Sequence, residues 1–238
     1  MRVTLLQQND DLLDIMYTAA RTCYSSFGTA FLHAATSTAS EEKKLKLVNR
    51  VLKSGHLSIA EHIIFTFGID GISRACSHQL VRHRLCTFSQ QSQRYINFDK
   101  LDFEYIMPPA IENTSGTNDD FATQYKALMR KIKNLYDDMV EYDIKPEDAR
   151  YIFPNAAATN IVVSTNLRNL MHMANLRLCT RAQWEVRQVF YNMTKLVSNS
   201  YPWLAEYLQP SCEIQGFCTE DKCCGRKPKL ESINGTKD

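Results

Sequence analysis

Hydrophobic side chains recur every three or four residues in several long stretches of the chain, which is the spacing of one face of an α-helix. On this basis helices are predicted over residues 10–23, 41–54, 72–85, 121–143, 166–176 and 181–199. The second of these has a possible capping box from Thr38 to Glu41 and a C-terminal stop at Gly55. Pro146, followed by Glu-Asp, predicts a further short helix, because proline and acidic side chains favour a first turn.

Segments rich in β-branched and aromatic residues predict strands between these helices. They cover residues 1–6, 62–69, 94–98, 103–107 and 156–164. Residues 86–93 are polar and have no periodicity, and we interpret them as a loop. The mixture predicts an α+β fold, with a single domain over residues 1–209 whose long helices flank a modest mixed or antiparallel sheet. Residues 210–238 are rich in cysteine, lysine and glycine and are expected to form a loosely ordered tail.

Composition narrows the class of protein only slightly. The 238-residue chain is 44% apolar and 23% charged, which is ordinary for a globular protein. Its net charge of +2 excludes a strong polycation, so anion binding has to come from local clusters of Arg and His. No segment is long and apolar enough to span a bilayer, and acidic residues stand where a signal peptide would be apolar. We therefore expect a cytoplasmic protein whose eight cysteines are reduced.

The candidate chemistry lies in a basic segment that begins Arg82-His83-Arg84. In a helix over residues 72–85, Gln79, Arg82 and His83 share a face that begins apolar and ends polar, which suggests a lined pocket. Arg84 points elsewhere, so the basic groups could hold phosphates from more than one direction. Guanidinium groups are suited to this task because they bind phosphate oxygens in pairs.

Ser92 and Arg94 follow in the same segment and add a hydroxyl and a second guanidinium. Two other interpretations stay open at this point. The cations could complement the dipole of a helix C-terminus. Alternatively, the segment from Arg82 to Arg94 could be a basic nucleic-acid-binding module, although the near-neutral total charge disfavours this.

The spacing R-H-R-x-x-T-x(4)-S-x-R from Arg82 to Arg94 resembles the signature of the flavin-dependent thymidylate synthases. The stretch from Gly55 to Phe67, G-H-x-S-x-x-E-H-x-x-F-x-F, is similar to a second motif of that family. The region from Ala149 to Glu185 is similar to its C-terminal half. The resemblance runs from roughly Met1 to Tyr207, in the order that the family has.

The resemblance implies the thymidylate-synthase-complementing-protein fold and an enzyme that methylates dUMP to dTMP. The carbon donor would be 5,10-methylenetetrahydrofolate, and the hydride source would be FAD reduced by NADPH. The active form would be a homotetramer whose active sites are shared between subunits, with no nucleic-acid or membrane partner. FAD would contact Ser58 from a neighbouring subunit, together with Arg82, His83, Arg84, Gln90, Asn166, Arg168 and His172. The nucleotide dUMP would contact Gln79, Leu80, Val81, Arg82, Gln90, Gln91, Ser92, Gln93, Arg94, Arg150 and Arg177.

Arg177 is the expected catalytic residue by the same resemblance, because a cation facing the uracil could stabilise negative charge around N3 and its carbonyls. Helical geometry places Arg168 and His172 on a different side from Arg177, so one helix could serve two ligands. A solvated or subunit-contact face is the alternative for Arg168 and His172. Ser92 is expected to orient dUMP, since no carboxylate lies near it in the sequence to activate it as a nucleophile.

Some features depart from the family or stay without a role. Gln90 stands where many relatives carry Glu, and His172 stands where many carry Asn. A flavoenzyme that methylates uracil in RNA is disfavoured, because the chain has no G-x-G-x-x-G motif. The tail cysteines lack paired C-x-x-C knuckles, so no metal site is predicted there and the tail is assigned no function.

Overall fold

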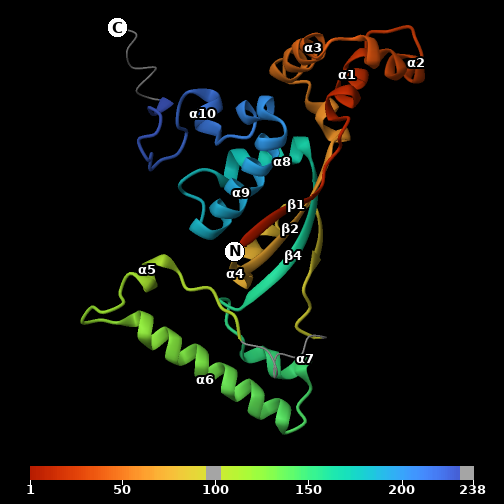
Figure 1. The fold of residues 1–238 in the computed structure, drawn as a ribbon. Coiled ribbons are helices and arrows are strands. Elements are labelled where there is room, and N and C mark those ends of the chain that lie inside the picture. Colours follow the sequence, from red (N-terminus) through yellow and green to blue (C-terminus); the bar gives the residue numbers. More distant parts are fainter. Residues whose placement is uncertain (95–102, 231–238) are drawn as a thin grey trace, which may run out of the picture. The chain divides into compact units, whose positions relative to one another are not determined.

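The structure is a computed structural model that describes residues 1–94 and 103–230 (Figure 1). The described residues group into two compact units. Unit 1 contains residues 1–2 and 69–82 and the described part of 88–162, whereas unit 2 contains residues 3–68 and 83–87 and the described residues from 163 onward. Strands β2 (Ile64–Ser73) and β4 (Ala158–Asn166) each run through both units, so the chain forms one α+β domain, as predicted.

The strands form an antiparallel sheet in the order β1-β2-β4-β3, where β1 is Arg2–Gln7 and β3 is Thr87–Gln90. Side chains alternate along β2, and Phe65, Phe67 and Ile69 are fully buried on one face. The prediction of a loop over residues 86–93 is wrong for β3. Exposed and half-buried side chains alternate in this four-residue strand, and such a short period-two pattern is hard to detect among polar residues.

Two further strand predictions have different outcomes. The strand predicted over residues 94–98 lies outside the described residues except for Arg94, which is in a turn. The strand predicted over residues 103–107 is wrong, because only an isolated antiparallel bridge joins Tyr105 to Ala157 there. Aromatic stacking holds this segment instead: the ring centroids of Phe103 and Phe153 are 4.9 Å apart, and those of Tyr136 and Phe153 are 4.7 Å apart.

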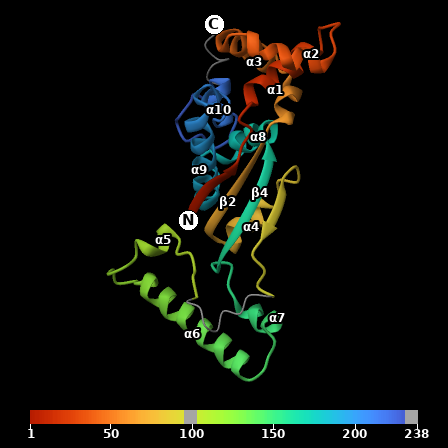
Figure 2. The same ribbon diagram turned by 45° about the vertical axis from the view of Figure 1, so that its right-hand side comes forward.

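Unit 2 contains most of the helices. These are α1 (Leu12–Thr22), α2 (Thr29–Ala34), α3 (Glu41–Lys53), α8 (Leu167–Arg177), α9 (Trp184–Ser200) and α10 (Ser211–Gln215), with 3-10 turns at Ala35–Thr38, Leu57–His62 and Pro202–Glu206. Helices α1 and α3 lie side by side, as do α8 and α9 (Figures 1 and 2). Apolar residues at helical spacing supply these contacts, and Met16, Val48, Leu170 and Phe190 are fully buried.

The ends of α3 show how local chemistry sets a helix boundary. The predicted capping box at Thr38 is wrong, because Thr38 belongs to a 3-10 turn and Ser40 is the N-cap. The Ser40 hydroxyl oxygen accepts a hydrogen bond from the backbone N–H of Lys43 at 3.4 Å. The predicted stop at Gly55 is confirmed, since Gly55 has a φ of +85°, which glycine adopts without strain.

Unit 1 contains α4 (Arg74–Leu80), α5 (Pro109–Glu112), α6 (Phe121–Glu141) and α7 (Pro146–Ala149), followed by a 3-10 turn at Arg150–Ile152. The long helix α6 contacts both α5 and α7 (Figure 1). The prediction of one helix over residues 72–85 is wrong at both ends. Ser73 still belongs to β2 and caps α4 by accepting the N–H of Cys76 at 3.0 Å, and the helix ends at Leu80. Arg82 and His83 therefore do not lie on a helix face.

The described part of the tail is ordered, which corrects the expectation of a loose segment. Helix α10 ends at Gly216, whose φ is +82°. A parallel bridge then joins Cys218 to Lys229, and the Cys218 side chain is buried. Across residues 1–94 and 103–230, no three His, Cys, Asp or Glu side chains are grouped so that they could hold a metal ion. Within the same residues, no helix has the length and apolar character needed to cross a membrane.

Candidate functional site

A cleft of about 640 Å³ runs along the first turns of α8 in unit 2. It is lined by Leu57, Glu61, Leu85, Asn166, Arg168, Asn169, Met171, His172 and Asn175. Asn166 is the N-cap of α8, and its Oδ1 accepts the backbone N–H of Asn169 at 2.8 Å. Because Oδ1 of Asn166 is used by the cap, the N–H groups of its Nδ2 are left to bind a ligand. The structure thus brings together Asn166, Arg168 and His172, three residues that the sequence predicts to contact FAD.

The cationic group in this cleft is already paired. Arg168 Nη1 forms an ion pair with Glu61, and the two side chains are 51% and 45% exposed. An ion pair this exposed contributes about 0–1 kcal/mol, so an anionic ligand can displace Glu61 from Arg168. Asn175 adds a buried side-chain oxygen for which the described residues provide no hydrogen-bond partner. Leaving such a group unpaired costs about 1–3 kcal/mol.

Arg177, at the C-terminal end of α8, contacts the basic motif directly. Its Nε donates to Nε2 of His83 at 3.0 Å. The His83 ring packs edge-on against Phe190, with centroids 5.7 Å apart, and the side chain is 9% exposed. Burial, followed by the charges of Arg177 and His172, lowers the pKa of His83 to about 4. His83 is therefore neutral near pH 7 and cannot supply a positive charge to a phosphate.

A second group of predicted ligand residues gathers in unit 1 around Glu147. Nε and Nη2 of Arg94 donate to Glu147 Oε2 at 3.1 and 3.0 Å. Nε of Arg150 donates to the Glu147 backbone oxygen at 3.0 Å, and the backbone N–H of Arg94 donates to Oγ of Ser92 at 3.2 Å. Burial and the nearby charge of Arg150 also lower the pKa of Arg74. Three guanidinium groups with one carboxylate leave a net positive charge, which suits a phosphate.

Gln90 has a fixed orientation in unit 1. Its Nε2 donates to Oγ of Ser77 at 2.9 Å and to Oγ1 of Thr159 at 3.3 Å. Both donor positions are therefore used inside the protein, and only the Gln90 carbonyl oxygen is left for a ligand. A glutamate at this position could not make the same two bonds.

The other predicted nucleotide contacts differ in what they can offer. Leu80 is 1% exposed, so its side chain belongs to the core and only its backbone could reach a ligand. Val81 is exposed in the turn that follows α4. Gln79 Nε2 lies 3.5 Å from the Ala75 oxygen, which is a weak hydrogen bond. Gln91 uses its backbone N–H to bond the Asn160 oxygen at 2.9 Å, and Gln93 is half-buried in a turn.

Two arginines of the motif keep their charges available. Arg82 and Arg84 are both exposed, and in the described parts of the chain neither guanidinium has an ion-pair partner. Ser58 is also exposed, but it lines a separate cleft of about 470 Å³ with residues of α1 and α2. The structure therefore does not bring Ser58 into the cleft of Arg168.

Sequence reasoning missed three participants. The sequence identifies Glu147 only as an acidic residue at a helix start, and it assigns no role to Arg74 or Asn175. Position along α8 could have indicated Asn175, because it follows Met171 by four residues and so lies near it on the helix surface. No sequence signal identifies Glu147 as the partner of Arg94, since the two are 53 residues apart.

Comparisons with known proteins give one consistent result. The sequence model of the family described as "Thymidylate synthase complementing protein" matches residues 4–203. A flavin-dependent thymidylate synthase of Nitratidesulfovibrio vulgaris is 38% identical and covers 98% of this chain and 97% of its own length. One from Geobacter sulfurreducens has the same identity and coverage. One from Thermococcus kodakarensis is 44% identical over 72% of this chain and 71% of its own length.

Proposed function

Because the chain belongs to the flavin-dependent thymidylate synthase family, it is an FAD-dependent enzyme that makes dTMP, and we propose that unit 2 holds the flavin while unit 1 holds the phosphate of dUMP. The substrates would be dUMP, 5,10-methylenetetrahydrofolate and NADPH. The observation that carries this division is that Asn166, Arg168 and His172 line one cleft, whereas Arg94 and Arg150 both bond to Glu147, through its carboxylate and its backbone oxygen.

The α8 cleft fits a flavin by its chemistry. Leu57, Leu85 and Met171 provide apolar wall for a ring system, and amides lie beside them. A phosphate can replace Glu61 as the partner of Arg168, because this ion pair is exposed. Arg84, which also belongs to unit 2, would meet the remaining phosphate charge. When bound and reduced, FAD supplies the hydride for the reaction.

The arginines of unit 1 would hold the nucleotide by its phosphate. Arg94 can turn from Glu147 to a phosphate because their ion pair is half-exposed, and Arg150 keeps its orientation through the Glu147 backbone oxygen. Arg74 supplies further positive charge beside Arg150. Ser92 would orient the nucleotide through its hydroxyl.

Arg177 would act on the uracil ring. Methylation at C5 requires electron density to be drawn onto the ring before the C5 proton leaves. A guanidinium facing N3 and its neighbouring carbonyl would stabilise the negative charge that develops there. With Nε held by His83, the Nη groups of Arg177 remain to perform this task.

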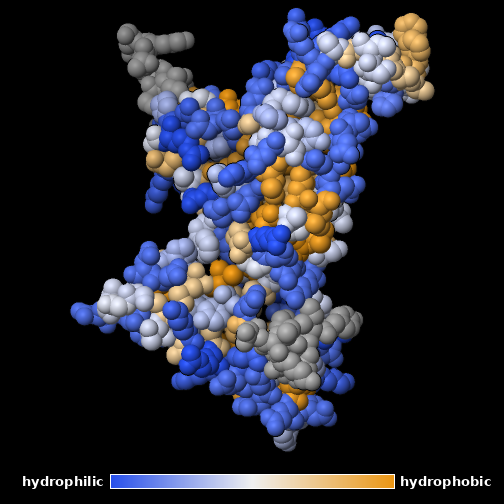
Figure 3. Space-filling view, viewed as in Figure 1, coloured by the Kyte–Doolittle hydropathy of each residue, from blue (hydrophilic) through white to orange (hydrophobic). Residues whose placement is uncertain are grey.

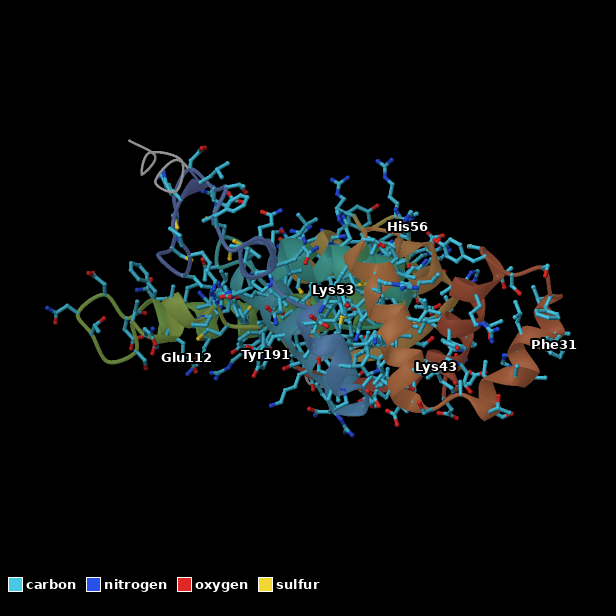
Figure 4. All side chains as sticks on the ribbon, turned by 90° about the horizontal axis from the view of Figure 1, so that it is seen from above. Phe31, Lys43, Lys53, His56, Glu112 and Tyr191 are labelled. Carbon is cyan, nitrogen blue, oxygen red and sulfur yellow. The ribbon has the colours of Figure 1, made fainter. Side chains whose placement is uncertain are left out.

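We also propose a homotetramer with shared sites, in the cytoplasm. Exposed apolar side chains in unit 2 support subunit contacts: Leu85 is 76% exposed, and Phe27 and Phe31 are 60% and 57% exposed with ring centroids 4.9 Å apart. Figure 3 shows apolar surface at the α2 end, and Figure 4 shows Phe31 at the outer end of that helix. A neighbouring subunit could also deliver its Ser58 to the flavin.

Replacement of Arg177 by alanine tests the proposal. Arg177→Ala should lower the rate of dTMP formation by roughly 100-fold or more while the visible flavin spectrum persists, because one electrostatic stabiliser is lost and the α8 cleft is not. Arg181→Ala is a matched control, since Arg181 pairs with Glu220 near the surface. Wild-type turnover in Arg177→Ala would refute the assigned role. A protein that binds polynucleotides and takes up no FAD would instead support the nucleic-acid-binding alternative.

A further inference from the structure

His83 lies at the centre of the R-H-R motif, yet its surroundings do not match those of its two neighbours. Arg82 and Arg84 are exposed, whereas His83 is 9% exposed and packs against Phe190 of α9. The backbone turns here, because the N–H of Cys86 donates to the His83 carbonyl at 3.1 Å. This turn follows the end of α4 and directs the imidazole inward, toward α8 and α9.

The inward direction brings the ring to Arg177. The Arg177 Nε–H points at His83 Nε2 over 3.0 Å, so Nε2 must carry no proton. The proton of a neutral ring is then on Nδ1. Arg177 and His172 on α8 are the charged and titratable side chains that act on His83, and Phe190 on α9 is apolar. Both α8 groups disfavour a second proton on the ring.

The geometry assigns His83 as a positioning residue for Arg177, because its unprotonated Nε2 anchors Nε and presents the Nη groups to the uracil. A guanidinium is planar, so fixing one of its N–H bonds restricts the plane of the other donors. A flexible arginine would have to lose this freedom each time the nucleotide binds. The inference rests on the proposed role of Arg177, and it gives His83 a task beside the FAD contact that the family resemblance implies.

Two substitutions of His83 distinguish the loss of its hydrogen-bond acceptor from the loss of its packing against Phe190. His83→Phe keeps a ring against Phe190 but has no acceptor, whereas His83→Gln offers an amide oxygen to Arg177 Nε. We expect His83→Phe to keep its flavin absorbance and to lose roughly 10- to 100-fold in kcat for dTMP formation, which is the scale of a misplaced catalytic group. His83→Gln should recover most of that loss. If His83→Phe does not fold, His83→Met and His83→Gln form the same comparison.

The affinity for dUMP, measured by calorimetry in a double-mutant cycle, tests whether His83 acts through Arg177. His83→Phe should weaken dUMP binding in the wild-type background and have no further effect in Arg177→Ala. Equal losses in both backgrounds, a wild-type kcat in His83→Phe, or recovery of that variant by excess FAD would each overturn the inference. Wild-type dTMP formation by Arg177→Ala would be a different failure, because it removes the proposed role of Arg177 itself.

Discussion

Acid should destabilise this protein through His83. The folded-state pKa of His83 is about 4, whereas an unperturbed histidine titrates near pH 6.5. The unfolded chain therefore binds the proton first, and the stabilising contribution is complete above about pH 6.5 and is lost as the pH falls toward 4. Linkage over this interval gives a loss of about 2 kcal/mol by pH 5 and about 3 kcal/mol by pH 4.

Urea unfolding at several pH values measures this contribution. Carboxylates titrate over the same interval, so the useful quantity is the difference between wild type and His83→Phe at one protein concentration. Between pH 7 and 5, wild type should lose about 2 kcal/mol more than His83→Phe. His78→Phe is a control for the loss of an imidazole, because His78 is exposed on α4. Parallel curves for wild type and His83→Phe would show that His83 is not held neutral by its surroundings.

Three smaller perturbations test individual contacts. Gln90→Glu should destabilise the fold by about 1–3 kcal/mol, because Ser77 already donates to the Arg74 oxygen and cannot donate to a carboxylate. Gln91→Glu is the matched control. An unchanged urea midpoint in Gln90→Glu would contradict this prediction. Asn166→Ala should lower stability by about 1 kcal/mol through the lost cap, whereas Asn166→Asp should keep it, and equal melting temperatures for the two variants would argue against capping. Glu61→Gln should change the free energy of unfolding by less than about 1 kcal/mol, because the ion pair with Arg168 is exposed. The same variant should bind FAD more tightly in a fluorescence titration, because no carboxylate then competes with FAD for Arg168. Weaker FAD binding would refute the competition between Glu61 and FAD.

Most of the secondary structure could be predicted because its signals are local. The helices around Met16, Val51 and Met129 have an apolar face that is visible in the sequence, and all three side chains are buried. The secondary-structure predictions are wrong where one element ends and the next begins. For the segment from Ile72 to Gln90 the sequence predicts a helix followed by a loop. The segment instead folds as the end of a strand, a short helix, a turn and a second strand. Pairing between strands overrides the helical spacing of its apolar residues.

The sequence by itself determined the family and the chemical character of the site, because a motif is a set of residue types at fixed spacings. Arg82, Ser92, Arg94 and Arg177 could be predicted as ligand residues without coordinates. Only the tertiary structure decided how each side chain is used. Burial keeps His83 neutral, so that its ring accepts a hydrogen bond from Arg177, and Arg94 is held on a carboxylate that no spacing indicates. These roles depend on burial and on partners across the fold, and neither property is contained in a local pattern of residues.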